Sequence, residues 1–448
     1  MFGKKLLGNT HIPHLKSTAS IPPTPMTPPS QVLLPLSQHI GAPATPTVAV
    51  GDTVKIGQKI AESTGYVSSP IYASISGTVK KMEDYLRPDG RIVSAIRIEG
   101  DGNMSVYEDI QPPTVSDLDS LIVAARESGL VGLGGAGFPL SVKLDALKKG
   151  IIDTVVLNGA ECEPYVTCDT QTMLYDADLI FAGISLLQKY APEVKNYIIG
   201  IEKNKPECIK KMKETFASDE KTRVATLPDK YPQGAEKILI YNTTRRVVGE
   251  GKLPADVGVL VINVTTLALL ARYILTGMPL VSRTVTVDGS AVVSPKNVIA
   301  PLGTPICELL DFCGTENLGK VLYGGPMMGI PAASQNEPTL KTTGGITALS
   351  IDDSKLKSPS ACIHCGKCVE ACPLYLEPDV LSRAFEYESR DERMAILDKH
   401  KVMLCMECGC CSFVCPANRP LVQNNRIGKA QLRDYKMQIE KSKDKGEK

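Results

Sequence analysis

The chain has 448 residues, of which 43% are hydrophobic and 22% are charged, and its formal net charge is +1. This length predicts roughly two to four domains with buried cores. A net charge so close to zero gives no electrostatic support for nucleic acid or for a strongly acidic partner.

The chain also has no segment that resembles a membrane span or a signal peptide. The most apolar stretch, residues 257–275, is interrupted by Asn263, Thr265, Thr266 and Arg272, whereas a spanning helix needs about 18 consecutive apolar residues. The first residues, "MFGKKLLGNTHIPHLK", lack the apolar core of a signal peptide. We therefore expect a cytoplasmic protein that has no transmembrane helix of its own and can still dock on a membrane protein.

Two β-type regions are expected at the N-terminus. Residues 1–30 are predicted to be extended, because "STASIPPTPMTPPS" is rich in Pro, Ser and Thr. Residues 31–110 contain short alternating runs separated by Gly-Asp, Gly-Gln and Ser-Pro, which predict β-hairpins. Their pattern resembles the lipoyl and biotinyl barrel-sandwich domains, which carry a prosthetic group on a lysine at a hairpin tip. The matching stretch, Glu62 to Ser69, has no lysine, so a structural domain is favoured over a carrier.

An α/β domain is expected next, over residues 111–278. Helical patterns such as "YDADLIFAGISLLQKY" alternate with the strand patterns "IIDTVVLN", "NYIIGIEK" and "VGVLVIN", which predicts a parallel sheet. The first helix is expected to begin at a capping-box-like pair, Ser116 and Asp119. Residues 279–345 return to β character and resemble the soluble-ligand-binding β-grasp unit of some electron-transfer proteins.

The remaining chain is predicted to be a helical, cysteine-rich module over residues 346–425 and a charged tail over residues 426–448. Nine of the 14 cysteines lie between Cys362 and Cys415. Eight of them form two copies of C-x2-C-x2-C-x3-C-P, the bacterial ferredoxin pattern for [4Fe-4S] clusters. The eight are Cys362, Cys365, Cys368, Cys372, Cys405, Cys408, Cys411 and Cys415.

In two-cluster ferredoxins the fourth cysteine of each copy binds the other cluster. We therefore predict that Cys415 joins the first three cysteines and that Cys372 joins Cys405, Cys408 and Cys411. Structural zinc sites are the alternative, but zinc sites use paired C-x2-C units and do not require the third cysteine or the proline. Cys410 breaks the spacing and is expected to pack away from the cluster, and His364 is expected near the cluster sulfurs or in solvent.

A glycine-rich loop precedes the first predicted strand. "GLVGLGGAGFP", residues 129–139, contains Gly132-x-Gly134-x-x-Gly137, the spacing of a dinucleotide loop. A dinucleotide loop should follow a strand, yet a helical pattern precedes this one. Glycines permit close backbone approach, and N–H groups together with Lys143 suit a phosphate, so the loop is better interpreted as a phosphate-binding loop that belongs with the later "LNGAECEPYVTCD".

These segments resemble the flavin subunit of respiratory complex I, whose pattern is close to GRGGAGFPxGxK followed by NxDESEPG. The resemblance is closer to the RnfC family of the Rnf ion-translocating electron transport complex, which also shares "QHIGAPATPTVAVGD", "YPQGAEK" and both cysteine motifs. It covers nearly all of the chain beyond residue 30. Two positions depart from the complex I pattern, since Ala160 replaces an Asp and Cys162 replaces a Ser.

The resemblance implies sites for FMN and NAD(H). The loop glycines and Lys143 match the FMN-phosphate site, and Asn158 and Glu161 match residues near the ribityl chain and ring. Glu163, Tyr231 and Glu236 match residues of the nicotinamide cleft, Asn263 and Thr266 match flavin contacts, and Phe138 is expected to stack on adenine or flank the ring. The implied set is Gly132, Gly134, Gly135, Gly137, Phe138, Lys143, Asn158, Glu161, Glu163, Tyr231, Glu236, Asn263 and Thr266. No general acid or base is expected, because hydride transfer between flavin and nicotinamide needs none.

The expected function is electron transfer between NAD(H) and ferredoxin or partner subunits. NAD exchanges two electrons and each cluster exchanges one, so a flavin belongs between them. The resemblance implies a peripheral subunit on the cytoplasmic face of a membrane complex that pumps ions. Two alternatives remain open: a cobalamin reductase of the propanediol-utilisation type, and a non-catalytic electron-relay scaffold. The sequence leaves open the coupling ion, the direction of electron flow and the choice between NAD and NADP.

Overall fold

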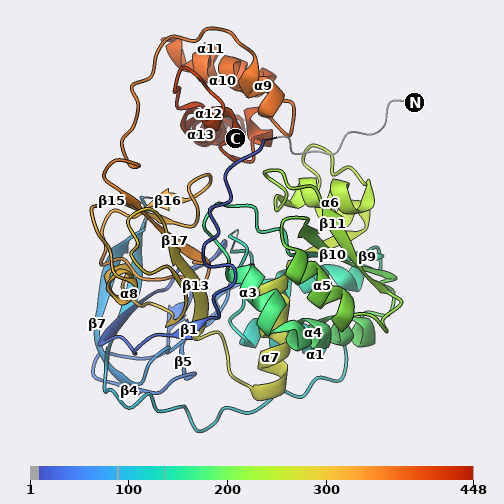
Figure 1. Cartoon of the computed structure of the whole chain (residues 1–448), viewed down its shortest axis with the longest axis vertical. Coiled ribbons are helices and arrows are strands. Elements are labelled where there is room, and N and C mark those ends of the chain that lie inside the picture. The colour runs from blue at the N-terminus through green and yellow to red at the C-terminus, as the bar shows by residue number, and fades with distance from the viewer. Residues whose placement is uncertain (1–9, 88–89, 136, 447–448) are drawn as a thin grey trace.

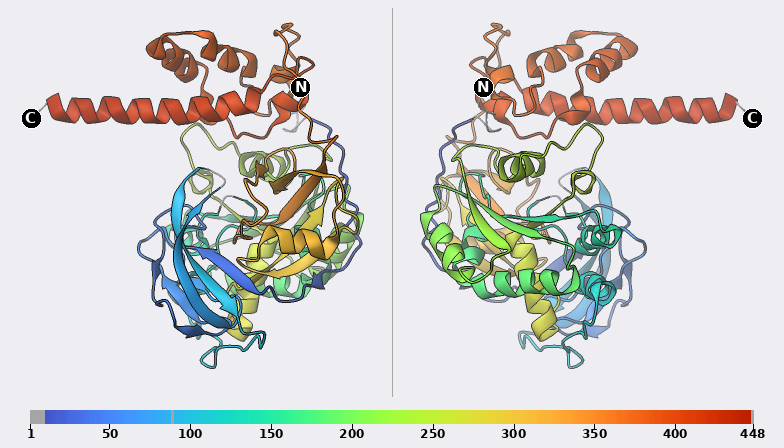
Figure 2. Two further views of the ribbon diagram at one scale, coloured as in Figure 1. Left: turned by 90° about the vertical axis from the view of Figure 1, so that its left-hand side faces the viewer. Right: turned by 90° about the vertical axis from the view of Figure 1, so that its right-hand side faces the viewer.

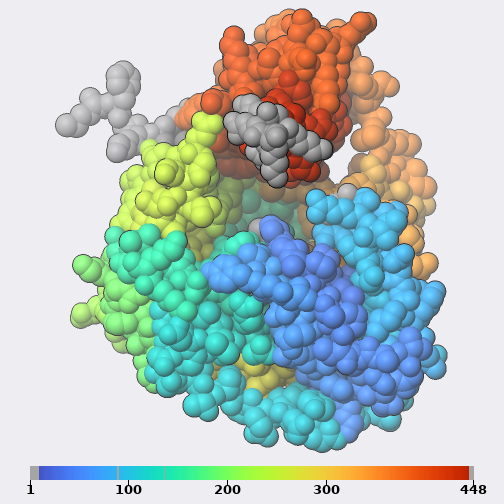
Figure 3. Space-filling model, turned by 180° about the vertical axis from the view of Figure 1, so that it is seen from behind, coloured from blue at the N-terminus to red at the C-terminus, as the bar shows by residue number. Residues whose placement is uncertain are grey.

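The computed structural model describes residues 10–87, 90–135 and 137–446. Two β-rich domains lie beside an α/β domain, and a helical module sits above them (Figure 1). Figure 3 shows the same order from behind, with the helical module above the α/β and barrel-sandwich domains. The predicted fold class, a multidomain α/β protein with these four kinds of unit, is confirmed.

The barrel-sandwich domain consists of two small sheets, with strand orders β2-β8-β7-β4 and β3-β5-β6. Alternation along β2 sends Val32 and Leu34 into a core shared with Ile60 of the other sheet. The hairpin after β5 is held against the next domain, because Arg126 donates to the carbonyls of Gly65 and Tyr66. The strands are β2 (Gln31–Pro35), β3 (Thr45–Pro46), β4 (Thr53–Val54), β5 (Lys59–Glu62), β6 (Ile71–Tyr72), β7 (Gly77–Leu86) and β8 (Ile92–Gly100).

The α/β domain is built on a four-stranded parallel sheet in the order β11-β10-β9-β12. Helices α4 and α7 pack on one face, where Leu187 and Leu267 join the main core, and α6 covers the other face through Leu239. The strands are β9 (Thr154–Asn158), β10 (Asn196–Glu202), β11 (Thr222–Leu227) and β12 (Val259–Asn263). The helices are α1 (Leu118–Glu127), α2 (Leu140–Asp145), η1 (Ala146–Lys149), α3 (Cys168–Tyr175), α4 (Ala177–Tyr190), α5 (Pro206–Thr215), α6 (Glu236–Thr244), η2 (Pro254–Val257) and α7 (Val264–Thr276).

Helix α1 begins one residue later than the sequence pattern suggested. Its capping box is formed by Asp117 and Ser120, not by Ser116 and Asp119. Asp117 has the extended backbone of an N-cap, and its carboxylate accepts the N–H of Ser120 at 2.8 Å. The Ser120 hydroxyl in turn accepts the N–H of Asp117 at 3.0 Å, which completes the reciprocal pair.

The β-grasp region forms a six-stranded sheet in the order β1-β14-β13-β17-β15-β16, with α8 packed against it through Ile306, Leu309 and Leu310. Its strands are β1 (Thr24–Pro25), β13 (Ser282–Asp288), β14 (Lys296–Pro301), β15 (Leu318–Tyr323), β16 (Ile330–Pro331) and β17 (Gly345–Ser350), and its helix is α8 (Ile306–Cys313). Strand β17 continues past the boundary expected at residue 345. The N-terminal segment contributes β1, which pairs with β14, and it also contacts the α/β domain, because Gln171 donates to the carbonyl of Ala19 at 3.0 Å.

The helical module consists of short helices, apart from its last element, α13. Helix α13 starts before the expected charged tail, and buries Leu421, Val422 and Leu432 before it projects from the body (Figure 2). The helices are α9 (Lys367–Ala371), α10 (Pro378–Arg383), η3 (Ala384–Glu386), α11 (Arg390–Lys399), η4 (Val402–Leu404), α12 (Cys410–Phe413) and α13 (Leu421–Gly446). Among the described residues, no helix combines the length and apolarity that a bilayer crossing requires.

Candidate functional site

The expected flavin residues gather where β9 and β12 end. The strand order reverses at β9: β10 and β11 lie on one side of it, and β12 lies on the other. In open α/β sheets ligands bind outside the carboxyl ends of the strands at such a switch point. The last residues of the two strands, Asn158 and Asn263, are register partners.

Both asparagines use their amides to hold neighbouring segments. Asn158 donates to the carbonyl of Gly234 at 2.9 Å and accepts the N–H of Ala160 at 3.1 Å. Asn263 caps α7 by accepting the N–H of Thr266 at 3.0 Å, and donates to Asp169 at 2.8 Å. Hydrogen bonds therefore join the ends of the two strands to Gly234 and to Asp169 of α3.

The glycine loop lies directly over Asn263. The loop closes on itself, because Gly132 donates to the carbonyl of Phe138 at 2.7 Å, and it is tied to α7 by the N–H of Leu133, which the Thr266 hydroxyl accepts at 3.0 Å. A Cβ atom on Gly134 would lie 3.4 Å from the Asn263 amide nitrogen. Gly135 has a φ of +114° and open space around its Cα, so the loop can admit a ligand there at close range.

Lys143 reaches the same place from α2. Its ammonium group donates to the carbonyl of Val261 at 3.1 Å and lies 3.3 Å from a carboxylate oxygen of Glu236. An ammonium group has three donors, so within the described residues one remains for a phosphate. The Glu236 side chain is 43% exposed, which leaves it free to turn away from the lysine.

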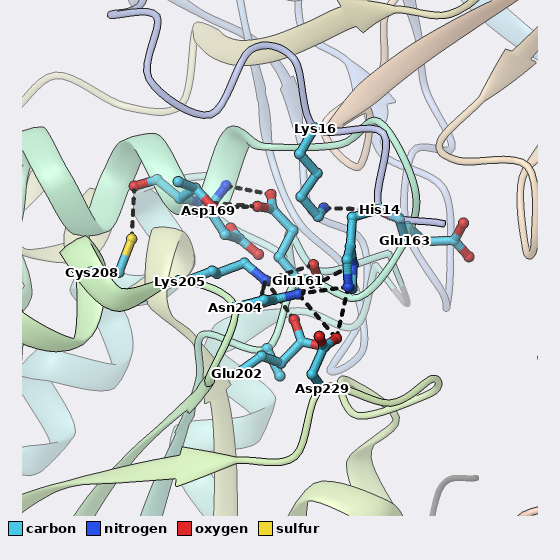
Figure 4. A network of polar contacts seen from close by, with 12 residues as sticks. His14, Lys16, Glu161, Glu163, Asp169, Glu202, Asn204, Lys205, Cys208 and Asp229 are labelled. Carbon is cyan, nitrogen blue, oxygen red and sulfur yellow. Dashed lines mark hydrogen bonds and ion pairs between the residues drawn. The ribbon is translucent and has the colours of Figure 1, made fainter. Parts of the chain in front are cut away.

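Glu161 is buried at the N-terminal end of α3. Its carboxylate accepts the N–H of Asp169 at 2.8 Å and the hydroxyl of Thr170 at 2.7 Å, so it caps the helix from outside (Figure 4). Lys205 donates to its carbonyl oxygen at 3.0 Å. Burial raises the pKa of Glu161, and the positive charges of Lys16 and Lys205 oppose that shift. In this structure the residue supports the site rather than lining it.

Glu163 and Tyr231 join the α/β domain to the β-grasp sheet. The Glu163 carboxylate accepts the Tyr231 hydroxyl at 3.1 Å and the N–H groups of Met327 and Met328 at 3.1 and 2.9 Å. Tyr231 is 1% exposed. Burial raises the pKa of Glu163, and these three donors oppose the shift. Their predicted contact with a nicotinamide nucleotide stays a prediction, since both side chains already have partners here.

The eight motif cysteines surround two separate cavities in the helical module. One cavity is lined by Cys362, Cys365, Cys368 and Cys415. The second is lined by Cys372, Cys405, Cys408 and Cys411. These are the two sets that crossed ligation predicts. His364 lines the first cavity, and Cys410, which was expected to pack away from the cluster, lines the second.

Four thiols around an open space fit an iron–sulfur cluster better than a single ion. Among the described residues, no three Cys, His, Asp or Glu side chains converge as they would on one metal ion. A cubane keeps its four thiolates apart at separate irons, whereas zinc draws them to about 2.3 Å from one point. The all-sulfur donor set is the one that such clusters use. The flavin residues fit FMN through the open approach at Gly135 and the spare donor of Lys143.

Several residues of the site region were not expected from the sequence. Asp169 links Asn263 to Thr265, accepting the Thr265 hydroxyl at 2.6 Å. Arg283 is 3% exposed and donates through one nitrogen to the carbonyls of Leu133 and Lys341. Its other two nitrogens have no partner within the described residues. The sequence carries no signal for these contacts, because Arg283 comes from the β-grasp sheet, far along the chain from the loop it supports.

Comparison with known proteins agrees with this architecture. Residues 4–103 match the RnfC barrel sandwich hybrid domain, residues 125–272 the Nuo51 FMN-binding domain, and residues 358–419 a 4Fe-4S dicluster domain. A chain of an NAD+-reducing [NiFe]-hydrogenase in the H2-reduced state has a similar fold, with a TM-score of 0.50 at 18% identity over 70% of this chain and 63% of that one.

Similar sequences cover most of the chain. The C subunit of the Na+-translocating ferredoxin:NAD+ oxidoreductase complex of Acetobacterium woodii is 42% identical over 83% of this chain and 85% of its own length. Its counterpart in the proton-translocating ferredoxin:NAD+ oxidoreductase complex of Clostridium ljungdahlii is 41% identical over 88% of each. The corresponding protein of the ion-translocating oxidoreductase complex of Rhodobacter capsulatus is 38% identical over 94% of this chain and 81% of its own length. The chain belongs to this family, the C subunits of the ion-translocating Rnf complexes.

Proposed function

We propose that this subunit transfers electrons between NAD(H) and ferredoxin or a partner subunit, through FMN and two [4Fe-4S] clusters. FMN exchanges either one or two electrons, which links a hydride donor to one-electron centres. The residues of this chain hold the flavin and the two clusters in the order in which electrons pass between them. The observation that carries the proposal is the contact between the two cofactor regions: Tyr231 of the flavin domain packs in one apolar cluster with Cys408 and Cys410.

Within this proposal, individual residues have distinct tasks. The loop glycines, Phe138 and Lys143 hold the FMN phosphate and ring, and Asn158, Asn263 and Thr266 fix the floor beneath them. Glu236 lies beside Lys143, so its carboxylate competes with the phosphate for the ammonium group of the lysine. Glu161 keeps α3 in place, and Glu163 and Tyr231 hold the wall between the flavin and the helical module.

The proposed location is the cytoplasmic face of the membrane, where the subunit is held by the other subunits of its complex. NAD(H) and ferredoxin are soluble partners of the reaction that the relatives are named for. A site facing them must open to the compartment that contains them. The family membership also favours this function over a cobalamin reductase, since the relatives reported above are oxidoreductase subunits of ion-translocating complexes.

Anaerobic purification followed by titration with NADH and NADPH tests the proposal. We expect NADH to bleach the flavin, to reduce both clusters as seen by electron paramagnetic resonance, and to support reduction of a viologen dye. A protein whose clusters are reduced by dithionite but never by NADH would be a scaffold, and the proposal would be wrong. The NADH to NADPH ratio of the rates gives the nucleotide preference.

A further inference from the structure

Both ends of the glycine loop are held by residues from other domains. At its start, the Lys341 ammonium group donates to the carbonyl of Gly129 at 2.8 Å. Near its end, the N–H of Ile40 donates to the carbonyl of Gly137 at 3.0 Å. Lys341 precedes β17 in the β-grasp region, and Ile40 follows β2 in the barrel-sandwich domain. The loop therefore depends on two domains to which it does not belong.

The middle of the loop is held at Leu133. Its N–H donates to the Thr266 hydroxyl at 3.0 Å, and its carbonyl accepts Nη1 of Arg283 at 3.4 Å. The same Nη1 atom donates to the carbonyl of Lys341 at 2.6 Å, so the contacts at the start and the middle of the loop are joined. Arg283 is 3% exposed and Lys341 is 1% exposed, so bulk water does not compete for these hydrogen bonds.

Holding these carbonyls also fixes the direction of the amide groups that follow them. A trans peptide is planar, so its C=O and N–H bonds point in opposite directions. The N–H of Gly134 therefore points away from Arg283, and the N–H of Phe138 points away from Ile40. Among the residues that the structure describes, these two N–H groups and that of Gly135 donate to no acceptor. Free backbone N–H groups gathered on one turn are a typical anion site.

The donor near the end of the loop, Ile40, comes from a rigid turn. Before it, Gln38 accepts the N–H of Lys341 at 3.0 Å. After it, Gly41 has a φ of +118°, and a Cβ atom there would overlap the carbonyl oxygen of Val67, so only glycine fits. Val67 lies in the stretch that matches the carrier hairpin of lipoyl-type domains. In this chain that hairpin supports the turn that holds the glycine loop.

We infer that Arg283 and the Ile40 turn set the preference of this site for a phosphorylated flavin, because they hold the glycine loop with its free amide groups toward the phosphate. Arg283 is a positioning residue, which acts through the loop and not by contact with the flavin. This inference rests on the proposed function. Lys143 supplies the positive charge that meets the phosphate, whereas Arg283 and Ile40 decide whether the amide groups are in place.

The ratio of FMN affinity to riboflavin affinity tests this inference, because riboflavin is the same ligand without the phosphate. Both flavins are titrated by fluorescence into the full-length protein after its own flavin has been removed and with its clusters in place. Arg283→Met should lower the ratio by about tenfold, and Arg283→Lys should restore most of it. Arg272→Met is the control, since Arg272 is a half-buried arginine of α7. Its loss should leave the ratio unchanged, because a general loss of stability weakens both flavins alike.

Ile40 separates the position of the loop from the charge of Arg283. Ile40→Pro removes the N–H donor without changing any charge, whereas Ile40→Ala keeps the donor. The proline variant should lower the FMN to riboflavin ratio as Arg283→Met does, and the alanine variant should not, because the Ile40 side chain is 56% exposed. A ratio that falls in Arg283→Met and stays unchanged in Ile40→Pro would mean that the charge alone acts, and the positioning role would be wrong. The Ile40 pair still decides the question if Arg283→Met does not fold.

Inorganic phosphate is a second probe, and it keeps this inference separate from the proposed function. Phosphate should compete with FMN and not with riboflavin, and Arg283→Met should require about tenfold more phosphate for the same competition. If the unaltered protein bound FMN no more tightly than riboflavin, the phosphate site of the proposed function would itself be wrong. If the unaltered protein preferred FMN and every variant kept that preference, only the inference about Arg283 and Ile40 would be overturned.

Discussion

Asn158 and Asn263 stand opposite each other as register partners at the ends of adjacent parallel strands. They are 105 residues apart in the chain (263 − 158). The Asn158 amide holds Gly234, and the Asn263 amide holds Asp169 at the start of α3. Asn263 also positions the glycine loop, because Gly134 packs directly on it. The proposed flavin site thus lies where the strand order of the sheet reverses, and the glycine loop lies over it.

Replacing Lys143 tests the phosphate assignment. Lys143→Ala should lower FMN affinity by about 10- to 100-fold, since a hydrogen bond to a charged group contributes about 1.5–3 kcal/mol. Both iron–sulfur signals should persist, because the lysine is remote from the helical module. Flavin content and absorption spectra measure the two separately. Lys148→Ala removes a nearby surface lysine of the adjacent 3-10 helix and should leave FMN bound. Full flavin occupancy in Lys143→Ala would rule out the assignment.

Thr266 is expected to hold the glycine loop through a single buried hydrogen bond. Thr266→Val leaves the N–H of Leu133 without its acceptor, which costs about 1–3 kcal/mol when the group is buried. We expect weaker FMN binding, measured by fluorescence titration, and a lower unfolding midpoint. Thr266→Ser keeps the hydroxyl and should restore both. Thr276→Val, on the exposed end of the same helix, should change neither. A Thr266→Ser protein that loses as much FMN affinity as Thr266→Val would show that the hydroxyl alone does not hold the loop, and the assignment would be wrong.

Cys415 lines the first cavity although it belongs to the second motif. Cys415→Ser should therefore remove the cluster of the first cavity, which is roughly four of eight irons. The surviving signal in electron paramagnetic resonance should match that of Cys365→Ser. Cys410→Ser is the control, because Cys410 is outside both predicted ligand sets. The iron content of this variant should be unchanged. A Cys415→Ser protein that keeps the Cys365-dependent cluster would contradict crossed ligation.

Lys341 should make stability depend on pH. Its ammonium group is buried among the Ser69 hydroxyl and the carbonyls of Pro70 and Gly129, at 2.6 to 3.0 Å. Burial lowers its pKa from 10.5 to about 7. Between these values the unfolded chain binds more protons than the folded one, so stability rises with pH, by up to about 1.4 kcal/mol per unit. Below about pH 7 this residue contributes no slope.

Denaturant unfolding at pH 7, 8 and 9 measures this effect by comparing variants. Lys341→Met should lose the rise that the unaltered protein shows, at the cost of lower stability at high pH, where two carbonyl groups lack donors. Lys211→Met, an exposed lysine of α5, should keep the rise. Parallel pH profiles for the unaltered protein and Lys341→Met would show that Lys341 stays charged throughout.

Local patterns in the sequence were sufficient to predict the kinds of unit that this protein contains. Two copies of C-x2-C-x2-C-x3-C-P specify cluster chemistry because a short loop by itself brings three thiols to one side of a cavity. Strand and helix periodicities likewise predicted the parallel sheet and the surrounding helices. The capping box of α1 was misplaced by one position, since Ser116, Asp117, Asp119 and Ser120 are all compatible with a cap and only the backbone conformation distinguishes them.

The sequence could not predict the hydrogen-bond partners of each charged residue. Glu161 and Glu163 look equivalent in "AECEP", yet one caps α3 and the other holds the β15–β16 loop. The unpartnered donors of Arg283 and the burial of Lys341 likewise depend on distant segments of the chain. Cysteine spacing determined which groups this protein binds, because ligation depends on neighbours a few residues apart. Only the packing of distant segments placed Tyr231 of the α/β domain against Cys408 and Cys410 of the helical module.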